Sequence, residues 1–248
     1  ELLFALGEAL YRDNRPDLAQ GWFDRTAEAD PDHELAALYR VSCRESLSDA
    51  EGALSAYADY IGRWPDNTSM RREYVRLLMS GRRFAEAARA IEGGMPYAGS
   101  TGAADHAALA VCYRNTERYR EAGALHRSLL RADPGSVEHL LGLALCLQKT
   151  GSFAAAVELL EKGAPYVQAA GPWSALGILY ARRGRSESAL IAFRKAAELA
   201  PDDPKPLRNM ARIYERTGLK DLARRYVADA ERLTRKADGQ GSFTNAGR

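Results

Sequence analysis

The sequence predicts an all-α fold, a right-handed superhelical solenoid of about seven helical hairpins, and three observations lead to this prediction. The chain of 248 residues is rich in alanine, leucine, arginine and glutamate and poor in β-branched residues, a composition that favours helix over strand. One alanine recurs at a nearly constant interval. Each interval contains two apolar stripes at helical spacing. Such a repeat is typical of stacked helical pairs.

The recurring alanine sets the period and the boundaries of the repeats. Its successive positions lie 33 to 35 residues apart, and a large, mostly apolar residue follows each alanine four positions later. The series consists of Ala19, Ala53, Ala87, Ala122, Ala156, Ala189 and Ala223. The seven predicted repeats of the solenoid domain 1–237 are residues 1–33, 34–67, 68–102, 103–136, 137–169, 170–203 and 204–237. Residues 238–248 are rich in glycine and polar side chains, so we expect a flexible tail or a linker there.

The sixth repeat shows the two helical stripes most clearly. Its first stripe runs from Trp173 to Tyr180 and its second from Ala189 to Ala196, with a glycine-containing turn between them. The small residue Gly177 in the first stripe lets the two backbones approach closely. Each predicted helix has only about 12 to 15 residues and is marginal alone in water, so we expect stability to come from stacking.

The sixth repeat also resembles the tetratricopeptide repeat (TPR) family. Its sequence PWSALGILYARRGRSESALIAFRKAAELAPDDP matches the family pattern of Trp, Leu, Gly, Tyr, Ala, Phe, Ala and Pro at every position. The first repeat keeps Gly7 and Phe23, and the seventh keeps Gly218 and Ala230. The resemblance covers roughly residues 1–237. It implies that the first helix of each repeat lines a concave inner face along which partner proteins usually lie.

Two repeats depart from this pattern. In the second repeat, Arg40 and Arg44 fall on expected core positions, so we predict a one-residue shift that uses Leu38 and Val41 instead. In the third repeat, two glycines and a proline occur within residues 93–96, so the second helix of that repeat should end early.

Catalytic and cofactor motifs are absent from the sequence, including phosphate-binding loops, dinucleotide fingerprints, nucleophile elbows, zinc helices and CxxC pairs. Cys43, Cys112 and Cys146 each occupy the tenth position of their repeat, so we interpret them as buried hydrophobes rather than redox or metal groups. His106 and His126 lie near each other in the fourth predicted hairpin. Either the two imidazoles are hydrogen-bonded groups or they are a pair of metal ligands, but zinc sites use three or four ligands. We expect no enzyme activity, cofactor or metal.

The segment Asn67-Thr68-Ser69 fits the pattern of a glycosylation acceptor. It also follows Pro65-Asp66 and precedes a predicted helix. A helix N-cap therefore explains the same residues, and we favour that interpretation.

Charge and hydropathy exclude several classes of partner. Lysine and arginine number 35 and aspartate and glutamate 33, so the net charge of +2 argues against a dedicated nucleic-acid binder. No run of 18 apolar residues is present, so no membrane span is expected. The chain begins at Glu1 within a pattern of leucines at helical spacing, as if inside a helix. It shows no signal peptide, and we expect a cytoplasmic location.

Charge is distributed unevenly along the chain. Residues 1–34 contain nine acids and three arginines, whereas residues 203–237 contain ten basic residues and five acids. This difference is either ordinary surface variation or the basis of head-to-tail self-association between copies.

The candidate binding surface follows from the resemblance, which assigns the first helix of each repeat to the inner face. An apolar floor is predicted there in repeats four to six, and cations with one asparagine flank it in repeats three and seven. The floor includes Ala108, Val111, Leu141, Leu145, Ala175 and Ile178. The flanking residues are Arg72, Arg76, Lys205, Arg208, Asn209 and Arg212. This pattern indicates a docking site for an apolar or amphipathic protein segment with acidic flanks, unless neighbouring helices or the tail cover the floor.

One known activity of the family does not fit these residues. The TPR proteins that clamp the free carboxylate of a chaperone tail use lysine and asparagine on one first helix, asparagine on the next, and lysine and arginine on the third. Here Leu141, Leu145 and Ala175 occupy the first two of these helices. We therefore predict a non-catalytic scaffold or adaptor. The alternatives are a TPR segment of a larger multidomain enzyme or assembly protein, and a carrier of an apolar ligand.

Overall fold

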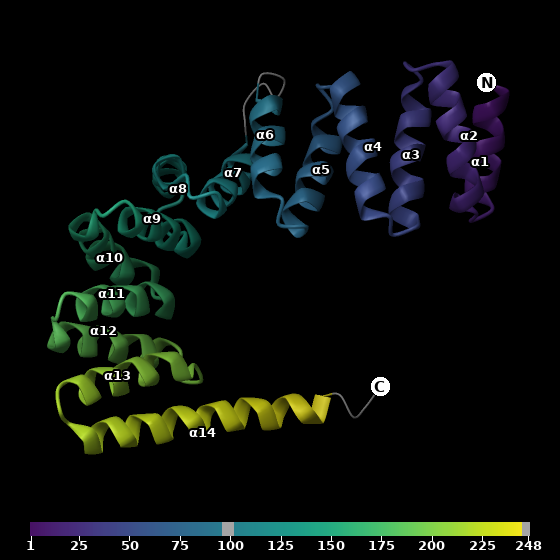
Figure 1. Ribbon diagram of the computed structural model, residues 1–248. Helices are drawn as coiled ribbons and strands as arrows, with labels where there is room; N and C mark the ends of the chain where they lie inside the picture. Colours follow the sequence, from purple (N-terminus) through teal and green to yellow (C-terminus); the bar gives the residue numbers. More distant parts are fainter. Residues whose placement is uncertain (96–101, 245–248) are drawn as a thin grey trace. The chain divides into compact units, whose positions relative to one another are not determined.

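The fold is known from a computed structural model that describes residues 1–95 and 102–244, with side chains described to residue 236. The described residues form fourteen α-helices and no strand (Figure 1). The helices are α1 (Leu2–Arg12), α2 (Pro16–Ala29), α3 (Glu34–Ser46), α4 (Ala50–Arg63), α5 (Thr68–Ser80), α6 (Phe84–Gly94), α7 (Ala103–Asn115), α8 (Tyr119–Ala132), α9 (Val137–Lys149), α10 (Phe153–Val167), α11 (Ala170–Arg182), α12 (Ser186–Leu199), α13 (Pro204–Arg216) and α14 (Lys220–Thr244). The all-α prediction is confirmed.

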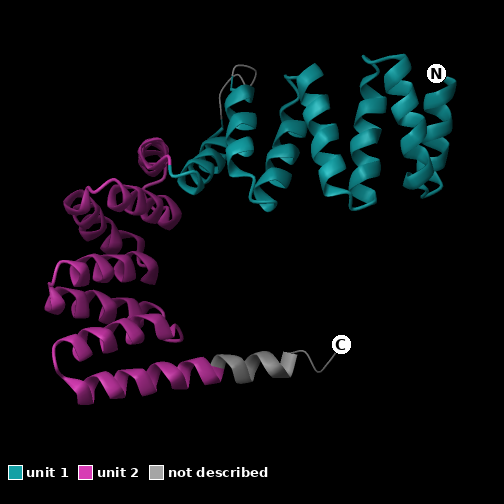
Figure 2. Cartoon of the chain, in the orientation of Figure 1, with its two compact units in different colours: residues 1–117 teal, residues 118–248 magenta. Residues whose placement is uncertain are grey.

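The chain divides into two compact units, residues 1–117 and 118–248 (Figure 2). Unit 1 contains α1 to α7 and unit 2 contains α8 to α14, so the division falls inside the predicted fourth repeat, residues 103–136. Within each unit every helix packs against the next along the chain. In unit 2, α11 also touches α9 and α13, which places the first helices of successive hairpins side by side.

The tight turns between paired helices each hold one residue with positive φ. Asn14, Ser48 and Arg82 take this conformation in unit 1, at φ of 58°, 57° and 59°. In unit 2 the corresponding residues include Gly184 and Gly218, at 75° and 82°. Glycine adopts this region without a steric penalty, whereas a residue with a Cβ atom does not.

The closest helix contacts confirm the predicted role of small residues. A Cβ atom added to Gly177 would lie 2.7 Å from Phe193 Cε1, and one added to Gly7 would lie 2.8 Å from Phe23 Cε1. Phe193 and Phe23 are both buried. The same glycine and phenylalanine contact therefore joins the first two helices of unit 1 and the pair α11 and α12 of unit 2.

The early helix end predicted in the third repeat is confirmed, and the shift predicted in the second repeat is confirmed for Val41 but not for Leu38, which is only half-buried. Val41 is buried, while Arg40 and Arg44 turn to Asp24 and Asp49 at 2.7 and 2.8 Å. Helix α6 is short at 11 residues and ends at Gly94, as the glycines predict. The proline of this segment, Pro96, lies outside the described residues.

The segment predicted as a flexible tail or a linker, residues 238–248, begins inside a helix. Helix α14 runs to Thr244 and so passes through most of this glycine-containing segment. Extending an existing helix adds one hydrogen bond for each residue fixed, so weak helix formers at the end of a long helix need not stop it. Residues 245–248 lie outside the described residues.

Candidate partner-binding surface

The predicted site residues of unit 1 lie on two helices. Arg72 and Arg76 project from α5, and Ala108 and Val111 belong to α7. Arg72, Arg76 and Ala108 line one hollow of about 360 Å³, while Val111 is half-buried outside it. The structure thus brings three of these four residues together.

The walls of this hollow are mostly apolar. Val75, Met79, Ile91 and Met95 contribute side chains from α5 and the end of α6. Gly94, the last residue of the short helix α6, lies against the side chain of the buried Arg71. The early end of α6, which the sequence predicts, therefore lies at the hollow.

Of the arginines at this hollow, Arg72 and Arg76 are each paired with a carboxylate of the same unit. Arg72 Nε and Nη2 donate to Asp105 Oδ1 and Oδ2 at 3.3 and 3.2 Å. Arg76 Nε donates to Glu73 Oε2 at 2.7 Å. These hydrogen bonds raise the pKa of both guanidinium groups.

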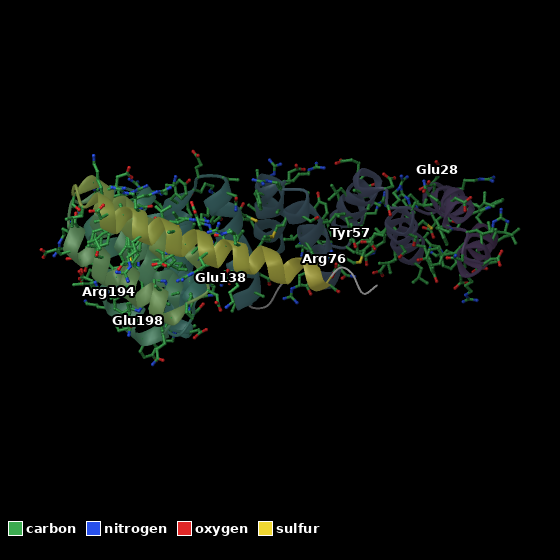
Figure 3. All side chains as sticks on the ribbon, turned by 90° about the horizontal axis from the view of Figure 1, so that it is seen from below. Glu28, Tyr57, Arg76, Glu138, Arg194 and Glu198 are labelled. Atoms are coloured by element: carbon green, nitrogen blue, oxygen red, sulfur yellow. The ribbon has the colours of Figure 1, made fainter. Side chains whose placement is uncertain are left out.

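Tyr57 of α4, labelled with Arg76 in Figure 3, is close enough to Arg76 to interact with it electrostatically. Its hydroxyl donates to Glu45 Oε1 at 2.8 Å, and burial, followed by this hydrogen bond, raises the pKa of Tyr57. The acidic side chains around Arg76 thus include both Glu73 and Glu45.

The apolar part of the predicted site in unit 2 is exposed where a partner could reach it. Leu145 and Ile178 are the ninth residues of α9 and α11, and their exposed fractions are 36% and 41%. Leu141 and Ala175, on the same two helices, are half-buried. Because α9 and α11 are in contact, these side chains belong to neighbouring first helices.

The cationic part of the site lies on α13. Asn209 and Arg212 line a hollow of about 300 Å³ together with Ile178 of α11. Arg208 and Arg212 also line a wider hollow, about 750 Å³, between α13 and α14. Lys205 is exposed at the start of α13 and lines neither hollow.

Among the lining residues of the smaller hollow that sequence analysis missed, two are charged, Arg182 and Arg216. Each is the thirteenth residue of its helix and follows Ile178 or Arg212 by four positions. The i, i+4 spacing that places residues on one helical face could have identified them.

The cations of α11 and α13 have no carboxylate partner among the described residues. Arg208 Nη2 donates to the hydroxyl of Thr234 at 2.8 Å, and Arg216 Nη2 donates to the carbonyl of Ala181 at 3.1 Å. Ion pairs described for the chain include none with Arg182, Lys205, Arg208, Arg212 or Arg216. Five exposed cations on two neighbouring helices of one unit thus have no ion pair among the described residues, although Glu215 and Glu231 line the wider hollow with Arg208 and Arg212.

The cysteines are core residues, as predicted. Cys43, Cys112 and Cys146 are all buried and unbridged. Burial raises the pKa of Cys43 and of Cys112 to about 11, so few of these thiols are ionised at neutral pH.

The remaining polar candidates occupy structural positions. His126 is fully buried in unit 2, with its ring 5.6 Å from that of His139, whereas His106 belongs to unit 1. The described residues contain no group of three or more side chains that could hold a metal ion. Asn67 Oδ1 accepts from the Met70 amide at 3.1 Å, so the N-cap interpretation of this segment is confirmed. None of the helices in the described ranges has the length and apolar character needed to cross a bilayer.

Comparisons with known proteins agree on the repeats. Models of the tetratricopeptide repeat match residues 44–93, 114–177 and 170–203. No curated protein sequence matches the chain.

Several solved structures share the fold. One is MamA 41-end from Desulfovibrio magneticus RS-1, with 18% identity, a TM-score of 0.58, and coverage of 68% of this chain and 96% of that one. Another is YrrB, described as a TPR protein with an unusual peptide-binding site, with 17% identity, a TM-score of 0.56, and coverage of 75% and 95%. A third is MamA MSR-1, with 22% identity, a TM-score of 0.52, and coverage of 67% and 96%.

Proposed function

Because the chain belongs to the tetratricopeptide repeat family, we propose that it is a non-catalytic scaffold or adaptor that binds a segment of a partner protein on the inner face of unit 2. The surface consists of Leu141, Leu145, Ala175 and Ile178 on α9 and α11, with the cations of α13 beside them. The TPR repeats and the structural neighbours support a role as a protein-interaction scaffold.

The observation that carries this proposal is the exposure of Leu145 and Ile178 at equivalent positions of two touching helices. Burying such side chains releases roughly 25 cal/mol for each Å² of apolar surface removed from water. A partner segment with an apolar side would gain this free energy. YrrB offers a precedent, because its description names a peptide-binding site on a TPR protein.

A random peptide library displayed on phage tests the proposal. Peptides are selected on the wild-type chain, and their affinities are then measured for Leu145→Glu and for Ile191→Glu. Ile191 is a matched control, because it lies on α12 and is 63% exposed but belongs to the second helix of its pair. We expect Leu145→Glu to lower affinity by about tenfold or more at any salt concentration, because binding would leave an unpaired charge against an apolar segment.

The control variant should retain wild-type affinity, and both variants should keep the wild-type circular dichroism spectrum. Equal affinities of wild-type, Leu145→Glu and Ile191→Glu chains for every selected peptide would contradict the proposal.

Self-association is the second candidate function, favoured by the opposite charges of residues 1–34 and 203–237. Head-to-tail contacts between copies would bring these segments together. Sedimentation velocity at low and high salt tests it, since an electrostatic assembly should dissociate as salt rises. A monomer at low salt and high protein concentration would contradict this candidate.

A further inference from the structure

The positive charges along α13 form a row. Arg208, Arg212 and Arg216 follow one another at intervals of four residues, the spacing that stacks side chains on one face of a helix. Like charges at this spacing destabilise a helix. Glu215 and Glu231 line the neighbouring hollow with Arg208 and Arg212, but none of the three arginines is in an ion pair described for the chain. An anionic ligand on the side of Arg212 and Arg216 would therefore reduce the repulsion along this row.

The hollow beside this row is not purely cationic. Its lining includes the apolar residues Ile178, Phe193 and Ile213. Arg182, Arg212 and Arg216 line the same hollow, and Asn209 adds an amide that can both donate and accept hydrogen bonds. A polyanion without apolar groups would leave Ile178 exposed to water.

This proposal rests on the proposed function: we propose that the hollow binds an acidic segment of a partner protein. One apolar side chain of the segment covers Ile178, and carboxylates on either side of it bind Arg182, Arg212 and Arg216. Arginine suits this role because its planar fork pairs with a carboxylate through two parallel hydrogen bonds.

The length of the row sets the size of the segment. Eight residues of helix separate Arg208 from Arg216, which corresponds to about 12 Å along the axis. An extended peptide covers this distance in about four residues. A segment of about four extended residues is therefore long enough to span the row, although only Arg212 and Arg216 of the row line the hollow itself.

Three blocked heptapeptides serve as probes. The first has a central leucine and six glutamates, the second replaces the glutamates by glutamines, and the third replaces the leucine by serine. Isothermal titration at low salt should show the glutamate peptide binding about tenfold more tightly than the glutamine peptide. The serine peptide should bind more weakly than the leucine peptide, because it cannot cover Ile178.

The chain variants are Arg212→Gln, the double variant Arg182→Gln/Arg212→Gln, and the control Arg194→Gln. Arg194 is exposed on α12 of the same unit and lines neither hollow (Figure 3). Arg212→Gln should weaken binding of the glutamate peptide about threefold or more, and the double variant should weaken it further. Arg194→Gln should match wild type.

The proposal is overturned if neither charged nor uncharged peptide binds, if the glutamine peptide binds as tightly as the glutamate peptide, or if Arg194→Gln weakens binding as much as Arg212→Gln does. The proposed function has its own readout in Leu145→Glu. Suppose that Leu145→Glu loses affinity for the phage-selected peptides while one of these failures occurs. The proposal of an acidic segment is then wrong, but the proposed docking surface on α9 and α11 is still supported.

Discussion

Two arginines on a first helix of each unit occupy the same helix positions but have different neighbours. Arg72 and Arg76 are the fifth and ninth residues of α5, and Arg208 and Arg212 are the fifth and ninth residues of α13. In unit 1 each arginine is bonded to a carboxylate, whereas in unit 2 neither is. Position in the repeat alone would assign all four to partner binding.

One residue accounts for part of this difference. The sixth residue of α5 is Glu73, which pairs with Arg76 one turn along the helix, while the sixth residue of α13 is Asn209. The rest of the difference comes from tertiary structure, because Asp105 reaches Arg72 from another helix, α7. Under the proposed function, we expect a first-helix cation to bind a partner only where no carboxylate of the chain is paired with it.

The largest expected effect concerns stability and tests whether the two units respond separately. Gly177→Leu should destabilise unit 2 by about 1–3 kcal/mol or more, because the new side chain would overlap the ring of Phe193. The buried thiols report on each unit, since Cys43 lies in unit 1 and Cys146 in unit 2. Alkylation of Cys146 should accelerate in the variant, and that of Cys43 should not. Equal acceleration at both cysteines would show that the units do not open independently.

Exchange of the sixth residues sharpens the electrostatic comparison. Asn209→Glu would give Arg212 the internal partner that Arg76 already has, so binding of the glutamate heptapeptide should weaken about fivefold. Glu73→Asn would free Arg76 in the same way, and titration should then detect additional weak binding by unit 1. If the Asn209→Glu variant binds the glutamate heptapeptide with unchanged affinity, the charge of Arg212 does not contribute to peptide binding.

Salt should separate the two parts of the surface. Exposed charges are screened over about 10 Å at 0.1 M salt, so affinity for the glutamate heptapeptide should fall steadily as sodium chloride rises. The decrease in affinity for phage-selected peptides caused by Leu145→Glu should persist at high salt, because it reflects the cost of burying a charge. A salt-independent affinity for the glutamate peptide would contradict a cationic site.

The smallest effect is expected at the neutralised pair of unit 1. Arg72 is 60% exposed, so its ion pair with Asp105 is largely screened by water. Asp105→Asn should therefore leave the melting temperature within about 2 °C of wild type in a calorimetric scan. A much larger drop would mean that this pair stabilises the packing of α5 against its neighbours rather than only balancing charge.

The helical architecture was predictable because it depends on local and periodic signals. The stripe containing Gly177 and the spacing to Phe193 predict the tight contact of α11 and α12, and the glycines before Pro96 predict the early end of α6. The end of α14 was not predictable from composition, because helix extension overrides weak local preference.

The candidate site was only partly predictable. Periodicity placed Leu145, Ile178 and Arg212 on first helices, but it did not reveal that Asp105 would neutralise Arg72 from a different helix. Residue Arg182 became part of the site only when the hollow between α11 and α13 was known. Both depend on contacts between helices, which a repeat pattern does not specify.

The most direct test of the account compares Arg76→Gln with Arg212→Gln, two identical changes at the ninth position of equivalent helices. Both are measured by titration of the blocked glutamate heptapeptide at low salt. The account predicts that Arg212→Gln weakens binding about threefold or more while Arg76→Gln leaves it unchanged, because Glu73 already neutralises Arg76. Equal losses in the two variants, or a loss in Arg76→Gln alone, would contradict it.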